Sequence, residues 1–309
     1  MRVVFMGTPE FSVPCLARLI SDGHDVAGVF TQPDKPKGRG KQLAAPPVKE
    51  YALLHGIPVF QPRTMRDGEA VGILRQLMPE LIVVTAFGKI LPAEVLDFPK
   101  YGCINIHASL LPRYRGAAPI QWAVLNGETR TGVTSMQMDV GLDTGDMLLR
   151  RETPIDGNMT AGELHDVLSQ LGADVLSETL TALQNGTLHP EKQDDALSNY
   201  APMLTKELSA LDFTCPAQKV HDRIRGLSPW PTATMRIGGK TLKVHRSVLC
   251  ADAGGQAGEV MHSGKRFVVS CGDGRCVELL TVQAEGKKAM AAADYLRGNP
   301  LAVGTILNR

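Results

Sequence analysis

The chain has 309 residues, of which 43% are hydrophobic and 21% charged, and its formal net charge is +1. At roughly 100–200 residues per domain, this length indicates two domains. The composition excludes a disordered or fibrous chain, because there is enough apolar material to form buried cores.

Short apolar runs alternate with helical patterns through the first half of the chain. After the first run comes Gly7-Thr8-Pro9, in which we expect Thr8 to cap a helix that begins at Pro9 and stops before Gly23. Strands that alternate with helices predict a Rossmann-like α/β fold, with a mostly parallel sheet covered on both faces. The expected strands are residues 3–6, 26–30, 58–60, 81–84 and 103–106. The helix that begins at Pro9 is expected to end near residue 22, and two further helices are expected at 47–55 and 68–78.

The pattern changes after residues 160–185, which predict one long amphipathic helix. Residues 189–206 are polar and irregular, and we interpret them as a linker between domains of residues 1–188 and 207–309. Beyond the linker, short alternating runs separated by glycine-rich turns predict a small antiparallel β-barrel. The expected elements there are a helix at 216–225 and strands at 232–237, 241–248, 267–270 and 277–282.

The charge balance differs between the two parts of the chain. Residues 1–205 hold 18 Lys and Arg against 23 Asp and Glu, a net charge of −5. Residues 206–309 hold 15 against 9, a net charge of +6. A basic terminal part joined to an acidic body indicates a polyanionic partner, although an unevenly charged solvated surface gives the same pattern.

Three polar residues are candidates for catalysis. Asn105 and His107 alternate at the carboxyl end of an expected strand, so their side chains leave the same face. Open α/β sheets bind ligands at this end of their strands. An asparagine amide can stabilise an oxyanion, and a histidine can hold a proton near neutral pH. Asp143 lies in a glycine-bracketed loop and can orient the histidine, although a structural histidine and a turn aspartate are the alternative.

The segment 109–119 that follows this strand combines two prolines and two arginines with no apolar period. It predicts a rigid loop at the end of a sheet strand, where functional residues are commonly placed. Arg113 and Arg115 can each bind an anion there or remain solvated.

Two long motifs in this region resemble the signature of the formyltetrahydrofolate-dependent transferases. One reads Asn-Ile-His-Ala-Ser-Leu-Leu-Pro-Arg-Tyr-Arg-Gly from Asn105, and the other reads Met-Asp-Val-Gly-Leu-Asp-Thr-Gly-Asp-Met-Leu over 138–148. The resemblance implies that Asn105, His107 and Asp143 form a catalytic trio, that 10-formyltetrahydrofolate is the formyl donor, and that no metal is needed. The residues implied to contact the folate are Ser109, Leu110, Leu111, Pro112, Phe87, Gly88, Ile90 and Asp139.

Two further features resemble the methionyl-tRNA formyltransferases within this superfamily. The segment 31–41, TQPDKPKGRGK, carries four basic residues, and its prolines and glycines should make it project as a loop suited to phosphate contacts. It resembles the loop by which those enzymes grip the acceptor end of tRNA. The basic C-terminal domain resembles the oligonucleotide-binding (OB) type of barrel that they append. The implied tRNA-binding residues are Arg39, Lys35, Lys37, Lys41 and Lys206.

The resemblance extends over nearly the whole chain, including GTPEF at residues 7–11 and Tyr200-Ala201-Pro202 in the linker. It implies transfer of a formyl group to the free α-amino group of methionine esterified to initiator tRNA, in support of translation initiation. Two positions depart from the family pattern. Tyr114 stands where tryptophan is common, and Met203 stands where a lysine is common, which removes one possible phosphate contact.

Other functions share some of these features. A formyltransferase for an amino-sugar nucleotide has no evident use for the basic loop, and one for a ribonucleotide usually lacks the C-terminal extension. Hydrolysis of the folate donor leaves the basic domain unexplained. The turn at residues 7–11 lacks GxGxxG, which disfavours a nicotinamide-dependent oxidoreductase. A pure nucleic-acid-binding module would ignore folate and would not need Asn105.

The six cysteines show no CxxC pair or metal-ligand spacing, which predicts a reduced protein without a zinc site. No apolar stretch reaches the ~20 residues that a membrane span needs, and Met1-Arg2 leads straight into an expected strand without a signal peptide. We therefore expect a cytoplasmic protein, and a monomer.

Overall fold

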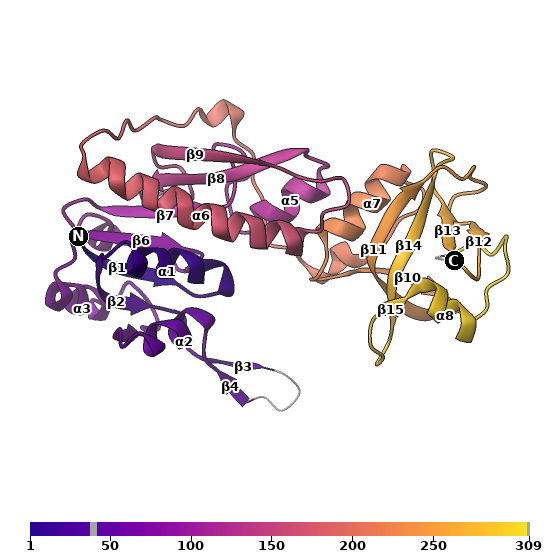
Figure 1. Ribbon diagram of the computed structural model, residues 1–309, viewed down its shortest axis with the longest axis horizontal. Helices are drawn as coiled ribbons and strands as arrows, with labels where there is room; N and C mark the ends of the chain where they lie inside the picture. Colours follow the sequence, from indigo (N-terminus) through magenta and orange to yellow (C-terminus); the bar gives the residue numbers. More distant parts are fainter. Residues whose placement is uncertain (38–41, 308–309) are drawn as a thin grey trace. The chain divides into compact units, whose positions relative to one another are not determined.

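The computed structural model describes residues 1–37 and 42–307. By their internal contacts the segments of the chain fall into two units (Figure 1). The first unit comprises Met1–Gly116, Gly132–Thr153 and His165–Tyr200, and the second comprises Ala117–Thr131, Pro154–Leu164 and Ala201–Arg309. The chain therefore passes between the units several times.

Seven strands form the sheet of the first unit. They are β1 (Arg2–Gly7), β2 (Asp25–Phe30), β5 (Val59–Phe60), β6 (Leu81–Thr85), β7 (Cys103–His107), β8 (Arg130–Gln137) and β9 (Met147–Pro154). Their order is β5-β2-β1-β6-β7-β8-β9. The pairs from β5 to β7 are parallel, and β7 pairs antiparallel with β8. This confirms the mostly parallel sheet expected from the alternation of strands and helices.

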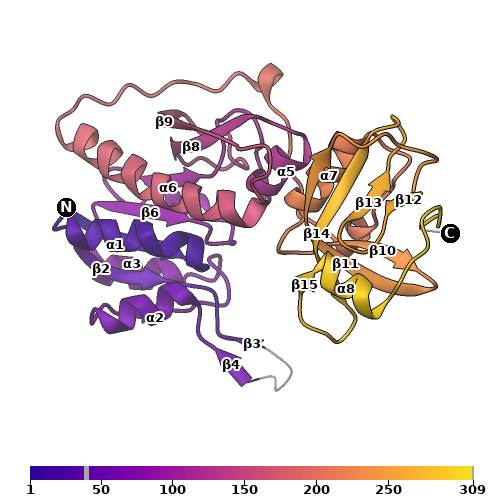
Figure 2. The same ribbon diagram turned by 45° about the vertical axis from the view of Figure 1, so that its right-hand side comes forward.

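Helices cover both faces of this sheet (Figures 1 and 2). They are α1 (Val13–Ser21), α2 (Pro47–Leu54), α3 (Glu69–Leu77), α4 (Ala93–Leu96) and α6 (Ala161–Gln184). On one face, Val4 forms a buried cluster with Leu74 of α3 and Val95 of α4. On the other face α6 lies close to the sheet, since a Cβ on Gly172 would lie 3.1 Å from the Ile106 side chain. Covered faces leave the strand ends as the place for a site.

The expectation that Thr8 caps a helix beginning at Pro9 is wrong. A 3₁₀ turn covers Glu10–Ser12, and α1 follows it. The Thr8 hydroxyl donates to the main-chain oxygen of Phe87 at 3.2 Å and accepts from the main-chain N–H of Gln32 at 3.2 Å. Its oxygen is therefore used to tie the ends of three strands together, instead of accepting from a helical N–H.

A curled antiparallel sheet forms most of the second unit. Its strands are β10 (Ala233–Ile237), β11 (Lys240–Cys250), β12 (Val260–His262), β13 (Phe267–Ser270), β14 (Cys276–Ala284) and β15 (Met290–Ala291). Their order is β10-β11-β14-β13-β12, with β15 paired to β14. Irregular register in β11 near Arg246 helps the long strand to bend. The expected antiparallel barrel is thus confirmed as a half-barrel. Within the described residues, its edge strands β10 and β12 do not pair with each other.

Three helices accompany this half-barrel. They are α5 (Pro119–Leu125), α7 (Ala217–Gly226) and α8 (Ala292–Gly298). Val220 and Ile224 of α7 are buried in one apolar cluster with Phe267 of the sheet. Helices α5 and α7 approach closely, because a Cβ on Gly226 would lie 2.8 Å from the Leu125 side chain.

Candidate active site

Strand β7 carries two of the predicted catalytic side chains to the edge of the sheet. Asn105 pairs in register with Val84 of β6 and with Met136 of β8. His107 is the last residue of the strand and is 6% exposed. Both alternate with Ile106, which packs under α6, so both side chains leave the opposite face of the sheet.

The side-chain amide of Asn105 is half-buried and makes no hydrogen bond to any residue within the described ranges 1–37 and 42–307. Polar groups held inside proteins usually have a protein or water partner. An amide without a protein partner keeps its two N–H donors available for a bound molecule. Asn105 is therefore placed and equipped to stabilise a negative charge next to His107.

The ring of His107 is fixed by the main chain of the loop that follows it. Its Nε2 lies 2.9 Å from the main-chain oxygen of Tyr114. A carbonyl oxygen only accepts, so Nε2 carries a hydrogen and donates it. Nδ1 then faces Asp143, whose Oδ2 is 3.7 Å away. In the neutral ring Nδ1 holds the lone pair, and a proton taken up there creates a cation opposite a carboxylate.

Asp143 reaches the histidine from the loop between β8 and β9. Its backbone has φ +55°, a left-handed conformation that residues other than glycine seldom adopt. Its Oδ2 accepts a 2.8 Å hydrogen bond from the main-chain N–H of Gly116. Nearby Gly145 has no room for a side chain, because a Cβ would lie 1.7 Å from the Gln137 carbonyl oxygen. The fold thus brings the three predicted residues to one edge of the sheet.

The predicted folate-contacting loop after β7 is braced from inside. The Ser109 hydroxyl donates to the main-chain oxygen of Arg113 at 2.6 Å, and Ser109 is fully buried. Leu111 is also buried and packs with two methionines of β8 and β9. The half-buried Leu110 and Pro112 are therefore the members of this loop with surface left for a ligand.

The second predicted folate loop follows β6. Phe87 is buried in the same cluster as Val4, whereas Ile90 is 68% exposed. Gly88 has φ +74°, and a Cβ there would lie 2.4 Å from the side-chain nitrogen of Gln32. That nitrogen donates to the Gly88 carbonyl at 3.3 Å. Phe87 anchors the loop, and Ile90 presents its apolar surface.

Asp139 was expected to contact folate, and its Oδ1 is used within its own loop. It accepts from the main-chain N–H of Gly141 at 2.9 Å and from the Thr144 hydroxyl at 2.7 Å. These two bonds close the turn that carries Asp143. Asp139 as a whole is exposed.

The predicted tRNA-binding residues are only partly described. A small antiparallel hairpin of β3 (Lys35–Lys37) and β4 (Gln42–Ala44) carries the start of the basic segment. The Lys35 amine donates to the Gln32 side chain at 2.8 Å. Lys206, in the second unit, is exposed in a 3₁₀ turn. The predicted residues outside the described ones are Arg39 and Lys41.

Comparison with known proteins decides the family of this chain. Residues 1–180 match the family described as formyl transferase, and residues 203–300 match the formyl transferase C-terminal domain. The chain belongs to the formyl transferase family. The candidate trio falls in the first matched region, and most of the half-barrel falls in the second.

Relatives of this formyl transferase are similar along their whole length. The chain is 53% identical to the methionyl-tRNA formyltransferase of Trichlorobacter lovleyi, over 99% of this chain and 96% of that protein. It is 54% identical to the methionyl-tRNA formyltransferase of Citrifermentans bemidjiense, over 100% of this chain and 97% of that protein.

A solved structure shares the fold of this chain. It is the N-formyltransferase from Helicobacter canadensis, in complex with folinic acid and dTDP-3-aminofucose. The TM-score is 0.67 at 20% identity, over 90% of this chain and 98% of that one. At this identity the likeness supports the fold alone.

Two residues of this formyl transferase that contact the candidate site were not anticipated. The Gln193 side chain donates to the main-chain oxygens of Asp143 and Gly145, both at 2.8 Å. The Asn199 side chain accepts from the main-chain N–H of Tyr114 at 2.5 Å. Both lie in the segment that the sequence presents as a polar linker. These three hydrogen bonds are to main-chain atoms, which no side-chain pattern reveals.

Thiol chemistry at the site is disfavoured. Cys103 lies on β7 close to Asn105, and burial raises the pKa of its thiol to about 12. Burial likewise raises the pKa of Cys15 to about 12. A thiol with so high a pKa stays protonated and is a poor nucleophile near neutral pH. Neither of these two thiols is therefore a candidate nucleophile.

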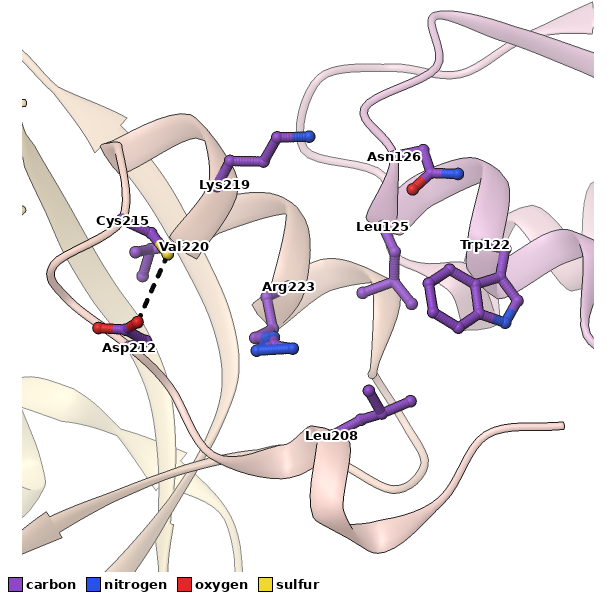
Figure 3. A pocket seen from close by; sticks show the side chains of 9 residues that line it. All are labelled: Trp122, Leu125, Asn126, Leu208, Asp212, Cys215, Lys219, Val220 and Arg223. Atoms are coloured by element: carbon purple, nitrogen blue, oxygen red, sulfur yellow. Dashed lines mark hydrogen bonds between the residues drawn. The ribbon is translucent and has the colours of Figure 1, made fainter. Parts of the chain in front are cut away.

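A hollow of about 230 Å³ lies in the second unit (Figure 3). Trp122 and Leu125 of α5 provide apolar surface, and Lys219 and Arg223 of α7 provide positive charge. None of the candidate trio lines it.

Among the described residues, no group of three or more His, Cys, Asp or Glu is placed to hold a metal ion. In the same residues, no helix is long and apolar enough to cross a membrane.

Proposed function

We propose that this formyl transferase moves the formyl group of 10-formyltetrahydrofolate onto the free α-amino group of methionine esterified to initiator tRNA. It thereby serves translation initiation. Relatives more than half identical over nearly the whole chain carry the name methionyl-tRNA formyltransferase, which supports the choice of acceptor. The observation that carries the chemistry is the available amide of Asn105 beside a histidine whose Nδ1 faces Asp143.

The reaction exchanges one C–N bond for another. The lone pair of the neutral α-amino nitrogen forms a bond to the formyl carbon, and the carbonyl electrons move onto oxygen. The resulting tetrahedral oxyanion collapses, and the bond from that carbon to the folate nitrogen breaks. The proton lost by the amine is delivered to the departing folate nitrogen, so that atoms and charge balance.

Each member of the trio has a role in this proposal. Asn105 donates its amide hydrogen to the oxyanion. His107 accepts the proton of the attacking amine on Nδ1, because its Nε2–H is committed to Tyr114. The protonated Nδ1 can then donate to the oxyanion and pass its proton to the leaving nitrogen. Asp143 stabilises the imidazolium cation between these two transfers.

We propose that the folate donor lies along the carboxyl edge of the sheet, against the loops after β6 and β7. Leu110, Pro112 and Ile90 contribute side-chain surface, since each retains some exposure. Gly88 permits a close approach of the main chain. The buried members Ser109, Leu111 and Phe87 support these loops from inside. Asp139, which is exposed, closes the turn between β8 and β9 that carries Asp143.

tRNA is the macromolecular partner in this proposal. In this proposal residues 1–188 form the catalytic domain, residues 189–206 form the linker, and residues 207–309 form the domain that binds tRNA. The net charge of +6 over 206–309 supports an electrostatic contact with phosphates. The proposed contacts are Lys35, Lys37, Arg39 and Lys41 on the basic segment and Lys206. We propose that the enzyme acts as a monomer in the cytoplasm.

Formyl transfer to an amino-sugar nucleotide is the nearest rival, because a sugar-bound N-formyltransferase has the same fold. The basic segment at residues 31–41 favours tRNA, since a sugar nucleotide has no extended phosphate backbone for four cations to contact. Identity is also much higher to the tRNA enzymes, at 53% and 54% against 20%.

The test is formyl transfer from labelled 10-formyltetrahydrofolate to initiator methionyl-tRNA. Uncharged initiator tRNA and an amino-sugar nucleotide serve as comparison acceptors. We expect label on the charged tRNA alone. Label on the sugar nucleotide alone would overturn the acceptor while retaining the chemistry, and folate binding without transfer to any of them would overturn the proposed reaction.

A further inference from the structure

A polar segment of residues 191–200, which we name the strap, connects strand β9 with the loop that follows β7 in the first unit. At one end Glu191 and Met147 form an antiparallel bridge, with main-chain hydrogen bonds of 2.8 and 2.9 Å. At the other end Tyr200 and Arg115 form a parallel bridge. The strap therefore joins the first residue of β9 to the loop that follows β7.

Gln193 uses both ends of its amide inside this arrangement. Its nitrogen donates to the carbonyl oxygens of Asp143 and Gly145, both at 2.8 Å. Its oxygen accepts from Nε of Arg115 at 2.9 Å. The two carbonyls belong to the turn in which Asp143 has φ +55°. Gln193 therefore binds the main chain of the turn from which the Asp143 side chain extends.

Asn199 makes the corresponding contact on the other side of the histidine. Its Oδ1 accepts from the main-chain N–H of Tyr114 at 2.5 Å. Tyr114 also has a left-handed backbone, with φ +60°. The carbonyl of this same residue accepts the hydrogen of His107 Nε2. The Asn199 side chain therefore holds the N–H of the residue whose carbonyl binds the ring, and the main-chain oxygen of Asn199 accepts from the next N–H, that of Arg115, at 3.0 Å.

We propose that Gln193 and Asn199 are positioning residues for His107. Gln193 holds the Asp143 carboxylate opposite Nδ1. Asn199 holds the N–H of Tyr114, and the carbonyl of that same residue lies opposite Nε2. The segment that the sequence presents as a linker is thus part of the catalytic apparatus, and this inference rests on the proposed function of the trio.

Two features distinguish this role from simple attachment of the strap. The strap is already held at both ends by main-chain bridges, so the two side-chain amides are not needed to retain it. Both amides also bond to residues with positive φ, Asp143 and Tyr114, which cost energy to hold in place. Each of those residues provides one of the two groups that face His107.

The first test is steady-state kinetics of Gln193→Ala and Gln193→Glu in the full-length enzyme. We expect kcat to fall about 10²-fold in both, as misplacement of a catalytic group predicts, with KM for methionyl-tRNA unchanged. Gln193→Glu keeps the volume and the acceptor for Arg115 but loses the donors to the two carbonyls. Wild-type turnover in Gln193→Glu would refute the role of this donor. Leu197→Ala, an exposed side chain on the strap, is the matched control with expected wild-type kinetics.

The second test compares Asn199→Ala with Asn199→Asp. We expect Asn199→Ala to lose about 10-fold or more in kcat, and Asn199→Asp to recover most of it, because a carboxylate oxygen still accepts from the Tyr114 N–H. Equal loss in both variants, at wild-type melting temperature, would show that the acceptor is not what matters.

A double-mutant comparison separates positioning from general damage. If Gln193 acts through Asp143, adding Gln193→Ala to Asp143→Asn should slow turnover by less than about threefold more. Losses that multiply would overturn the proposed coupling. The melting temperature of every variant shows whether the fold is retained.

A measurement on the free enzyme keeps this inference separate from the choice of acceptor. The ¹⁵N shifts of the His107 imidazole report which nitrogen carries hydrogen. We expect the Nε2–H tautomer in the wild type and a mixture of tautomers in Asn199→Ala. An unchanged pattern would overturn the positioning role even if the enzyme formylates methionyl-tRNA. The expected change would stand even if the acceptor proved to be another molecule.

Discussion

The main-chain N–H of Gly116 donates a 2.8 Å hydrogen bond to Oδ2 of Asp143. The same carboxylate oxygen faces Nδ1 of His107 at 3.7 Å. The loop after β7 therefore supplies an anchor for the carboxylate as well as the carbonyl that binds the other nitrogen of the ring. Substitution of the aspartate can remove its charge without removing this anchor.

Asp143→Asn is expected to lower kcat by about 10²–10⁴-fold, the usual range for loss of acid–base assistance. The asparagine keeps an oxygen for the Gly116 N–H, so the loop should stay in place. It no longer supplies the negative charge that stabilises a proton on His107. Single-turnover formyl transfer with saturating substrates measures this step, and wild-type rates would remove Asp143 from the mechanism.

Asn105→Ala is expected to lower kcat by roughly 10²–10³-fold, which corresponds to about 2.7–4 kcal/mol for one oxyanion donor. Stability should change little, because the amide has no hydrogen-bond partner among the described residues. Steady-state kinetics and a melting curve test both statements. Asn158→Ala removes an exposed amide elsewhere and serves as the control, with unchanged turnover expected.

Gly145→Ala is expected to reduce both stability and turnover. A Cβ at this position would lie 1.7 Å from the Gln137 carbonyl oxygen, so the turn that carries Asp143 must move. Gly72→Ala in α3 is the control, because its Cβ would meet nothing within 4 Å. Alanine in a helix should there add about 0.5–1 kcal/mol of stability. Wild-type kcat in Gly145→Ala would show that the position of this turn is unimportant.

The central strands of the first unit were predictable because they are buried on both faces. Their sequences are largely apolar, and β6 is buried at every position. Strand β9 was not anticipated, since most of it is partly or fully exposed and it contains Arg150 and Arg151. The hairpin of β3 and β4 was missed for a related reason, because its lysines and prolines give no alternating pattern.

The proposed trio follows from side-chain chemistry and from the family resemblance, because Asn105, His107 and Asp143 carry the proposed functional groups on their own side chains. The contacts that orient it were not predictable in this way. The Tyr114 carbonyl, the Gly116 N–H and the carbonyls bound by Gln193 are main-chain atoms, which every residue possesses. The geometry of the loops decides which of them meet the site, and that geometry requires the fold.

The basic segment yields a prediction about tRNA. Arg39→Ala is expected to raise KM for methionyl-tRNA while leaving KM for the folate donor unchanged, because a proposed phosphate contact is lost and the proposed folate contacts are kept. The slope of log affinity against log salt should also become shallower by about one unit or less. Arg75→Ala, which removes an exposed arginine of α3, is the charge-matched control. Equal damage to both substrates would contradict the assignment of Arg39.

The second unit contains a buried histidine whose titration should affect stability. Nε2 of His221 lies 2.8 Å from the Gly157 carbonyl, so it donates, and Nδ1 lies 2.9 Å from the Ser247 hydroxyl, from which it accepts. Burial is the main cause that lowers the pKa of His221, and Arg225 adds to the lowering, while the Gly157 bond and Asp222 oppose it. The folded protein therefore favours the neutral ring.

The sign of the pH effect follows from this direction. An unfolded histidine has a pKa near 6.5, so the unfolded chain binds a proton at a pH where folded His221 does not. The contribution of His221 to the free energy of unfolding is complete above about pH 6.5 and is lost as the pH falls toward the lowered pKa. Each pH unit between the two pKa values corresponds to about 1.4 kcal/mol. His221→Gln, whose amide can still donate to Gly157 and accept from Ser247, should flatten the dependence on pH.

Urea unfolding followed by tryptophan fluorescence measures this effect directly. Both tryptophans, Trp122 and Trp230, lie in the second unit, so their signal reports on the unit that contains His221. His189→Gln removes an exposed histidine of the first unit and should leave the dependence on pH unchanged. If His221→Gln keeps the wild-type loss of stability between about pH 7 and 5, the titrating group must be another one. If the loss disappears, one buried imidazole limits the acid stability of the half-barrel.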